Sequence, residues 1–203
     1  PNLLSNEIID FVAVSDKFVP HFHIPLQSGN DEILTKMRRK YLSDLYVDRI
    51  ARIKKQMPNC CIGVDVIVGF PGETEEHFLT TYEFLNKLDV SYLHVFPYSE
   101  RNNTTAKKLP NKVTKAEKTE RAQRLRILSE KKKRYFYETQ LGRSMQVLWE
   151  EERQGEMMQG FSENYIRFEA PYEKAKVNSI ETLLFDKINE SGLAKASVKE
   201  HLQ

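Results

Sequence analysis

The sequence predicts an α/β fold for residues 1–139 and a small all-β barrel for residues 140–203. In the first part, segments with apolar residues every three or four positions alternate with short β-branched runs, which is typical of parallel strands joined by outer helices. In the second part, short runs of period two follow one another closely, as in a small closed barrel. We therefore expect a parallel sheet with helical crossovers, a boundary near residue 139, and then a small closed barrel.

The helices of the first part are predicted from apolar spacing and from signals at their ends. Apolar residues recur on one face of residues 43–57, which Pro58 ends. Thr114 and Glu117 have the spacing of a capping box, which predicts the start of a long basic helix that ends near residues 140–142. The other helices are expected at residues 5–15, shortly after residue 30, and at residues 75–88.

The strands are predicted from β-branched and alternating runs that turn residues separate. Those of the first part are expected at residues 18–26, 62–69 and 91–97. Those of the second part are expected at residues 144–150, 156–161, 164–169, 181–188 and 192–198.

Composition excludes several classes of protein. No apolar run approaches the roughly 18 residues that cross a bilayer and no signal-like start is present, so we expect a cytoplasmic protein without a membrane partner. Cys60 and Cys61 are adjacent and lack metal-site spacing, so we expect two reduced thiols in the core. Because the chain opens at Pro1 rather than Met, we expect it to be a fragment of a longer protein.

Positive charge is concentrated in two stretches of the chain. Residues 36–55 carry eight lysines and arginines against two aspartates, and residues 112–138 carry ten against four glutamates. Residues 140–203 are acidic, with eight basic and eleven acidic side chains. The two basic stretches indicate a polyanionic partner, although solvated helix faces would give the same pattern.

The three strands of the first part carry polar residues in one common phase. His23, Asp65 and His94 alternate with aliphatic neighbours, and Gln27 keeps this phase where the first strand ends. A strand buried on both faces would be apolar throughout, so we expect the aliphatic face to pack on helices and the polar face to line a shared lumen. Buried polar groups need partners, so these residues either bond to one another as structural groups or bind a polar ligand.

The segment Asp65–Thr74 reads as a strand, a tight turn and the start of a helix. Gly69 and Gly72 permit positive φ or a close approach of the backbone to a ligand, and Thr74 can cap the helix. Ligands of parallel α/β folds bind at the carboxyl ends of the strands, where this turn would lie.

Two neighbouring segments offer polar groups at the same edge. Gln27 and Ser28 carry donors and acceptors that suit ribose or amino-acid groups, unless Ser28 or Asn30 only caps a helix. Arg39 lies in a basic run and can hold a carboxylate or phosphate, unless it is merely solvated.

Four ordered motifs resemble those of the radical S-adenosylmethionine methylthiotransferases. They are His21–Asn30, similar to H-x-P-x-Q-S-G; Met37–Tyr41, similar to M-x-R-x-Y; Asp65–Thr74, similar to D-x-I-V-G-F-P-G-E-T; and Phe96–Arg101, similar to F-x-Y-S-x-R. Residues 140–203 resemble TRAM, the small RNA-binding barrel that ends these proteins. The resemblance implies half of a TIM-like barrel for residues 1–139 and an OB-like barrel for residues 140–203. Ser91–Ser99 is most similar to the branch that modifies N6-threonylcarbamoyladenosine beside the tRNA anticodon.

This resemblance implies an enzyme that uses S-adenosylmethionine and 4Fe-4S clusters to add a methylthio group to tRNA. It implies that S-adenosylmethionine lies along the Asp65–Thr74 segment; the residues expected to bind it are His23, Gln27, Ser28, Arg39, Asp65, Ile67, Gly69, Pro71, Glu73 and Tyr98. No catalytic acid or base and no metal ligand follow, because the family's cluster-binding domain and C-x-x-x-C-x-x-C loop are absent from this sequence. We therefore expect this chain to be inactive alone and the intact enzyme to be monomeric.

The barrel is expected to bind RNA. Ile166 and Phe168 would face its core, which leaves Tyr165 and Arg167 on the outer face to stack on unpaired bases. Asn164 would reach a base edge. An exposed strand face without RNA is the alternative for Tyr165 and Arg167.

Because the barrel is acidic overall, phosphate contacts are expected from the basic helix, through Lys131, Lys132 and Arg134.

Two other functions stay open at this point. The chain is either a noncatalytic RNA-binding module or part of a methylthiotransferase that acts on another adenosine derivative or on a ribosomal protein. Residues 102–104 replace a Gly that precedes Thr in many relatives, so this loop is expected to have a different shape.

Overall fold

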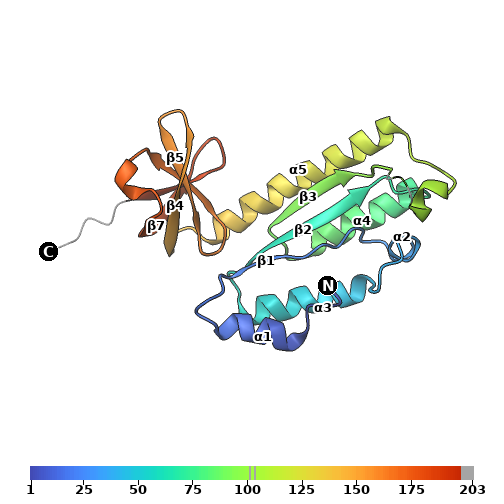
Figure 1. The fold of residues 1–203 in the computed structure, drawn as a ribbon, viewed down its shortest axis with the longest axis horizontal. Coiled ribbons are helices and arrows are strands. Elements are labelled where there is room, and N and C mark those ends of the chain that lie inside the picture. Colours follow the sequence, from blue (N-terminus) through green and yellow to red (C-terminus); the bar gives the residue numbers. More distant parts are fainter. Residues whose placement is uncertain (101, 103, 198–203) are drawn as a thin grey trace.

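A computed structural model of the protein describes residues 1–100, 102 and 104–197. A three-stranded parallel sheet with its helices is connected by one long helix to a closed five-stranded barrel (Figure 1). The expected combination of a parallel α/β part and a small closed barrel is therefore confirmed, whereas the TIM-like and OB-like assignments stay predictions. Arg101, Asn103 and Val198, which belong to predicted motifs and strands, lie outside the described residues.

The elements of the α/β part begin and end close to the predicted positions, apart from the first strand. They are α1 (Asn6–Val14), β1 (His21–His23), α2 (Asp31–Lys36), α3 (Ser43–Gln56), β2 (Cys61–Val68), α4 (Glu75–Lys87), β3 (Tyr92–Pro97), the 3-10 helix η1 (Thr105–Lys108) and α5 (Lys115–Thr139). Thr74 and Thr114 cap α4 and α5, as predicted. The capping box predicted at Thr114 is confirmed, and Thr74 forms a second one with His77 that was not predicted from the sequence. No helix within these described residues has both the length and the apolar character of a membrane span.

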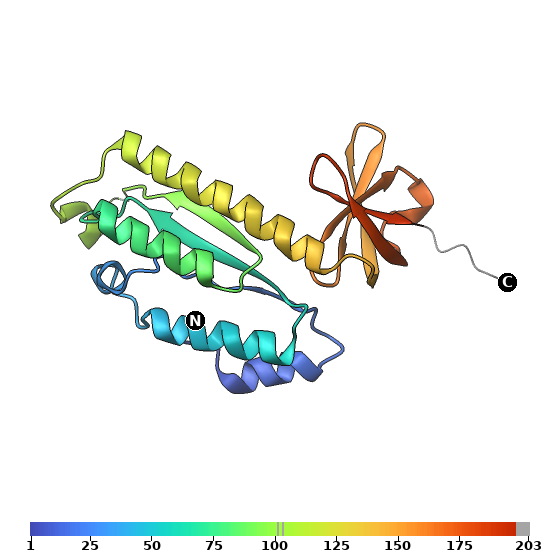
Figure 2. The same ribbon diagram turned by 180° about the vertical axis from the view of Figure 1, so that it is seen from behind.

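The helices cover one face of the sheet. The strands lie in the order β1-β2-β3 and all run parallel, and α3, α4 and α5 lie in front of them in Figure 2. Val64, Val66 and Val68 of β2 are at most 1% exposed and share one core cluster with residues from these helices. The prediction that the aliphatic face packs on helices is therefore confirmed.

The first strand is shorter than predicted. Phe18 and Val19 are more than half exposed and precede it, so only His21–His23 pairs regularly with β2. Pro25 lacks an N–H and interrupts the ladder. The chain nevertheless stays beside β2, and an isolated bridge pairs Gln27 with Val66.

The barrel contains β4 (Ser144–Gln154), β5 (Met157–Ser162), β6 (Arg167–Pro171), the 3-10 helix η2 (Lys174–Lys176), β7 (Ile180–Ile188) and β8 (Ala194–Ser197). The strands close in the order β4-β5-β6-β8-β7. Trp149, Phe168 and Phe185 fill the core, each at most 2% exposed. Ile166 is also fully buried, so the predicted inward face of Ile166 and Phe168 is confirmed.

The third barrel strand begins later than predicted. Residues 164–169 were expected to be extended, but the chain turns before Arg167. Ser162 Oγ accepts a hydrogen bond from the Ile166 N–H at 2.9 Å, and Tyr165 adopts a φ of 64°. The turn places Tyr165 beside the α/β part instead of on an open strand.

The long helix α5 leads to the amino-terminal ends of the strands, where the barrel lies in both views (Figures 1 and 2). Cys61 of β2 and Phe136 and Tyr137 of α5 belong to the same buried cluster as the barrel core. The Gly69 turn lies at the other end of β2. Because β2 has eight residues, its two ends lie about 23 Å apart at roughly 3.3 Å per residue.

Candidate functional site

The polar residues of the three strands form one cluster. His23 Nε2 lies 2.7 Å from Asp65 Oδ1, and the ring centroids of His23 and His94 are 5.0 Å apart. Tyr92 meets His94 edge to face at 5.2 Å. The prediction of a shared polar face is therefore confirmed, and His23 and His94 are exposed on it.

A buried ion pair shapes the turn that follows β2. Gly69 has a φ of 76°, and its N–H donates to Glu73 Oε1 at 2.8 Å. Arg121 of α5 donates to the same oxygen at 2.8 Å, and both side chains are at most 4% exposed. Burial raises the pKa of the Glu73 carboxyl, while the bonds from Gly69 and Arg121 oppose that rise. Glu73 and the buried Pro71 therefore set the shape of the turn from within.

A cavity of about 190 Å³ lies at the carboxyl ends of β2 and β3. Arg39, Ile67 and Tyr98 line it, so the structure brings three of the predicted cofactor-binding residues together. The Tyr98 ring packs edge to face on Phe70 at 5.2 Å, and Lys118 Nζ donates to the Tyr98 carbonyl at 3.1 Å. A guanidinium, an aliphatic side chain and an aromatic ring at one site suit a ligand that combines a carboxylate with a nucleoside.

Gln27 and Ser28 have different surroundings. Gln27 has a φ of 76°, and its N–H donates to the Asp65 carbonyl at 2.8 Å; such strain in a residue other than glycine often marks a functional segment. Ser28 is 1% exposed, and its hydroxyl is 3.1 Å from Thr81 Oγ1 and accepts from the Asn30 N–H at 3.2 Å. The Ser28 hydroxyl therefore supports the start of α2, which Asn30 caps, and we do not assign it to a ligand.

The described residues include no group of three His, Cys, Asp or Glu side chains that could hold a metal ion. Cys60 and Cys61 are buried free thiols, as predicted. Burial raises the pKa of both thiols to about 12, so they are protonated at neutral pH and poor metal ligands. An iron–sulfur cluster therefore does not fit the residues that the structure describes.

Aromatic rings join the barrel to the amino-terminal ends of the strands. Tyr165 stacks on His21 with centroids 4.1 Å apart and on Phe161 at 4.7 Å. His21 Nε2 lies 2.9 Å from the Tyr92 hydroxyl. Burial lowers the pKa of His21 and raises that of Tyr92, so both are neutral at pH 7. Because the protein occupies the ring faces of Tyr165, its predicted stacking on an unpaired base is corrected to a contact between the two parts.

Asn164 also connects the two parts. Its side chain is buried, and Nδ2 donates to the Asn59 carbonyl at 3.1 Å and to Gln140 Oε1 at 3.2 Å. Oδ1 accepts from the Ser162 hydroxyl at 2.7 Å. This corrects the expectation that Asn164 reads a base edge, because its amide already bonds within the protein at both ends.

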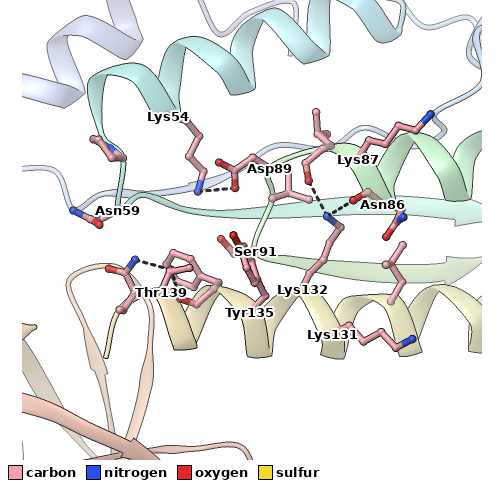
Figure 3. A pocket seen from close by; sticks show the side chains of 16 residues that line it. Lys54, Asn59, Asn86, Lys87, Asp89, Ser91, Lys131, Lys132, Tyr135 and Thr139 are labelled. Atoms are coloured by element: carbon pink, nitrogen blue, oxygen red, sulfur yellow. Dashed lines mark hydrogen bonds and ion pairs between the residues drawn. The ribbon is translucent and has the colours of Figure 1, made fainter. Parts of the chain in front are cut away.

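The predicted phosphate-binding residues lie on the last part of α5, where Lys131 and Lys132 line a cavity of about 570 Å³ (Figure 3). Figure 3 shows Lys132 reaching the end of α4, where Nζ donates to the carbonyls of Asn86 and Leu88 at 3.1 and 2.7 Å. Burial lowers the pKa of Lys132. Lys132 therefore stabilises the end of α4, which corrects its assignment to phosphate, while Lys131 and Arg134 are exposed.

Arg121 and Phe161 shape these sites but were absent from the predicted set. From the sequence, Arg121 belongs only to a basic stretch, yet it is buried in phase with Leu125 and Leu128 of α5. A cation on the apolar stripe of a helix is the signal that would identify such a residue. Phe161 has no comparable local signal, because its partners Tyr165 and Arg167 lie across a turn.

Residues 2–85 match the family model described as "Radical SAM superfamily". This match includes β1, β2, the Gly69 turn and most of α4. The match therefore assigns β1, β2 and their part of the polar face to a radical SAM domain.

Similarity to curated proteins narrows this class. The chain is 38% identical over 168 residues to threonylcarbamoyladenosine tRNA methylthiotransferase MtaB of Bacillus subtilis, over 81% of this chain and 37% of the relative. It is 41% identical over 163 residues to MtaB of Aquifex aeolicus, over 80% of this chain and 38% of the relative. It is 38% identical over 168 residues to tRNA-2-methylthio-N(6)-dimethylallyladenosine synthase of Lachnoclostridium phytofermentans, over 82% of this chain and 37% of the relative.

The chain belongs to the radical SAM methylthiotransferase family. It spans 37–38% of the length of these curated relatives.

We expect Glu73→Gln to lower the free energy of unfolding by about 3 kcal/mol, because it leaves the buried Arg121 cation without its nearest carboxylate. Glu138→Gln is the matched control, since Glu138 is 49% exposed and pairs with Arg134 on the surface of the same helix. Its loss should cost about 0.5 kcal/mol or less. Urea unfolding followed by far-ultraviolet circular dichroism measures both changes, and equal losses would contradict a special role for Glu73.

The lowered pKa of His21 predicts a loss of stability in mild acid. Below about pH 6.5 the unfolded chain protonates His21 while the folded protein still holds it neutral. The contribution of neutral His21 to the free energy of unfolding is thus complete above that pH. It is lost as the pH falls through the pKa that His21 has in the folded protein. His21→Gln does not titrate, so its free energy of unfolding should fall less than that of the wild type between neutral and mildly acid pH. Parallel curves from urea titrations of the two proteins would refute this.

Proposed function

We propose that this chain is the carboxyl-terminal part of an enzyme that adds a methylthio group to N6-threonylcarbamoyladenosine next to the anticodon of tRNA. The observation that carries the proposal is the match, over 80–81% of the chain, to relatives named threonylcarbamoyladenosine tRNA methylthiotransferase. The shared polar face of β1, β2 and β3 supports it, because such an enzyme must hold a cofactor and a nucleoside against the same wall. A TRAM-type barrel, a monomeric state and a cytoplasmic location belong to the same proposal.

The cofactor S-adenosylmethionine would lie at the carboxyl edge of the sheet. Arg39 would bind its carboxylate, and Ile67 and Tyr98 would contact its adenine. Asp65 would accept hydrogen bonds from ribose hydroxyls while His23 holds its carboxylate in place. When bound, the cofactor supplies the radical and methyl chemistry of the family. This chain would bind and orient it, and no step is assigned to an iron–sulfur cluster.

The tRNA would contact the protein around the barrel end of the sheet. Arg167 offers a guanidinium for an unpaired nucleotide, and the exposed Lys131 and Arg134 offer charge for phosphates. Lys131 lines the cavity in Figure 3 together with Lys87, while Lys54 and Lys132 of the same cavity are held by Asp89 and by the carbonyls of Asn86 and Leu88.

A second candidate substrate comes from the other group of relatives. The protein named tRNA-2-methylthio-N(6)-dimethylallyladenosine synthase is 38% identical to this chain over 168 residues. Dimethylallyladenosine in tRNA is therefore the alternative target.

The proposal is tested by deleting the whole gene in the source organism and analysing tRNA nucleosides by mass spectrometry. We expect loss of the 2-methylthio derivative of threonylcarbamoyladenosine and its return with the wild-type gene. Asp65→Asn should restore it about tenfold less well, because it removes the charge that pairs with His23. Asp89→Asn is the matched control, since Asp89 is 68% exposed and pairs with Lys54 away from the polar face.

Unchanged levels of that nucleoside in the deletion strain would contradict the proposed substrate. Loss of the 2-methylthio derivative of dimethylallyladenosine instead would establish the alternative.

A further inference from the structure

A cavity of about 360 Å³ lies where the sheet, α5 and the barrel meet. This volume falls in the range of about 300–1,000 Å³ that small ligands occupy. In the described part of the chain β3 is an edge strand, and Leu93 lies at this edge. Ser129 Oγ accepts from the Leu93 N–H at 2.8 Å and donates to its carbonyl at 3.1 Å. The edge is therefore closed to an added strand here, and recognition must come from side chains.

Aromatic rings surround the cavity from all three sides. Tyr92 comes from β3, Phe136 and Tyr137 come from α5, and Phe161 comes from the barrel. The ring of Tyr92 lies directly against Gly63, where a Cβ would come within 2.3 Å of its Cζ. One side of this ring therefore rests on the sheet. Aromatic walls of this kind are typical of sites that hold unpaired bases, since every base has an apolar face.

Two cations from different parts of the chain flank the same cavity. Lys133 of α5 lies with Nζ 5.6 Å from the Tyr137 ring, and Arg167 of β6 lies with Cζ 5.4 Å from the Phe161 ring. Nε of Arg167 is buried and has no hydrogen-bond partner among the described residues. The cationic groups that a phosphate can reach are therefore the terminal nitrogens of Arg167 and Nζ of Lys133.

The position of Arg167 is set by the helix that carries Lys133. The Arg167 N–H donates to the Tyr137 hydroxyl at 2.9 Å, and Tyr137 follows Lys133 by one helical turn. Asn164 adds bonds to Asn59 and Gln140 from the same turn of the barrel. Tyr137 therefore connects the two cations, because Lys133 lies over its ring and its hydroxyl fixes the backbone of Arg167.

We propose that this cavity binds one unpaired nucleotide of the RNA substrate, with its base against the Tyr92 ring and the edge of the Phe161 ring and its phosphate on Arg167 and Lys133. This inference rests on the proposed tRNA function. Cys61 at the cavity and Ile67 at the proposed cofactor site are six residues apart on β2, which is about 20 Å at roughly 3.3 Å per residue. His94, which also lines the cavity, pairs with Asp65 at the polar face. A nucleotide held at the Cys61 end therefore anchors the RNA while a neighbour reaches the polar face past His94.

The experiment uses the protein at its natural length and an RNA stem-loop with the anticodon-loop sequence, in which 2-aminopurine replaces one loop base at a time. We expect one loop position, other than the reactive adenosine, to lose about half of its fluorescence or more on binding, because its base enters an aromatic cavity. Phe161→Leu should remove this loss at that position.

Arg167→Gln tests the phosphate contact. It should weaken RNA binding about tenfold and lower the slope of log affinity against log salt by about one ion. Arg153→Gln is the matched control, because Arg153 lies over the Tyr172 ring, 3.4 Å from its centroid, on the same barrel. Trp149, the single tryptophan and part of the barrel core, reports by its own fluorescence that each variant has folded.

If the wild-type protein binds the RNA but no loop position is quenched, or if Arg167→Gln binds as tightly as Arg153→Gln, the cavity is not a nucleotide site and the proposed function stands. If the wild-type protein does not bind the RNA at all, both this inference and the proposed tRNA function fail.

Discussion

The functional surface of this protein depends on the side-chain alternation of parallel strands that helices cover on one face only. Val64, Val66 and Val68 pack into the helices, so Asp65 and Ile67 must point the other way. A slip of one residue would expose the valines and bury a carboxylate among apolar side chains, which fixes the phase strongly. The polar cluster thus follows from the same burial that stabilises the sheet.

The helix α5 fixes the distance between the two ends of this surface. Near its start, Arg121 binds Glu73 and holds the turn after β2; near its end, Tyr137 accepts from the Arg167 N–H and holds the barrel. Sixteen residues separate Arg121 from Tyr137 on this helix, or about 24 Å at roughly 1.5 Å per residue. The helix therefore keeps a nearly constant distance between the proposed cofactor edge and the proposed RNA anchor.

Local features of the fold were predictable from the sequence. The strand phases, the caps at Thr74 and Thr114 and the inward face of Ile166 each depend on residues within about four positions. The partners of Glu73 and Asn164 were not predictable, because the Glu73–Arg121 bond spans 48 residues and the Asn164–Asn59 bond spans 105. Long-range bonds of this kind turned three predicted ligand contacts, Ser28, Lys132 and Asn164, into structural ones. The candidate site was therefore predicted at the level of the sheet face and less well at the level of single side chains.

The central claim is that one sheet face holds the cofactor at its carboxyl end and the RNA at its amino end. A crystal structure of the natural-length protein with S-adenosylmethionine and an RNA stem-loop tests it most directly. The account predicts cofactor density against Ile67 and Tyr98, and RNA density that runs from Arg167 across Tyr92 and His94. Cofactor density elsewhere, or RNA bound only to the outer surface of the barrel, would contradict it.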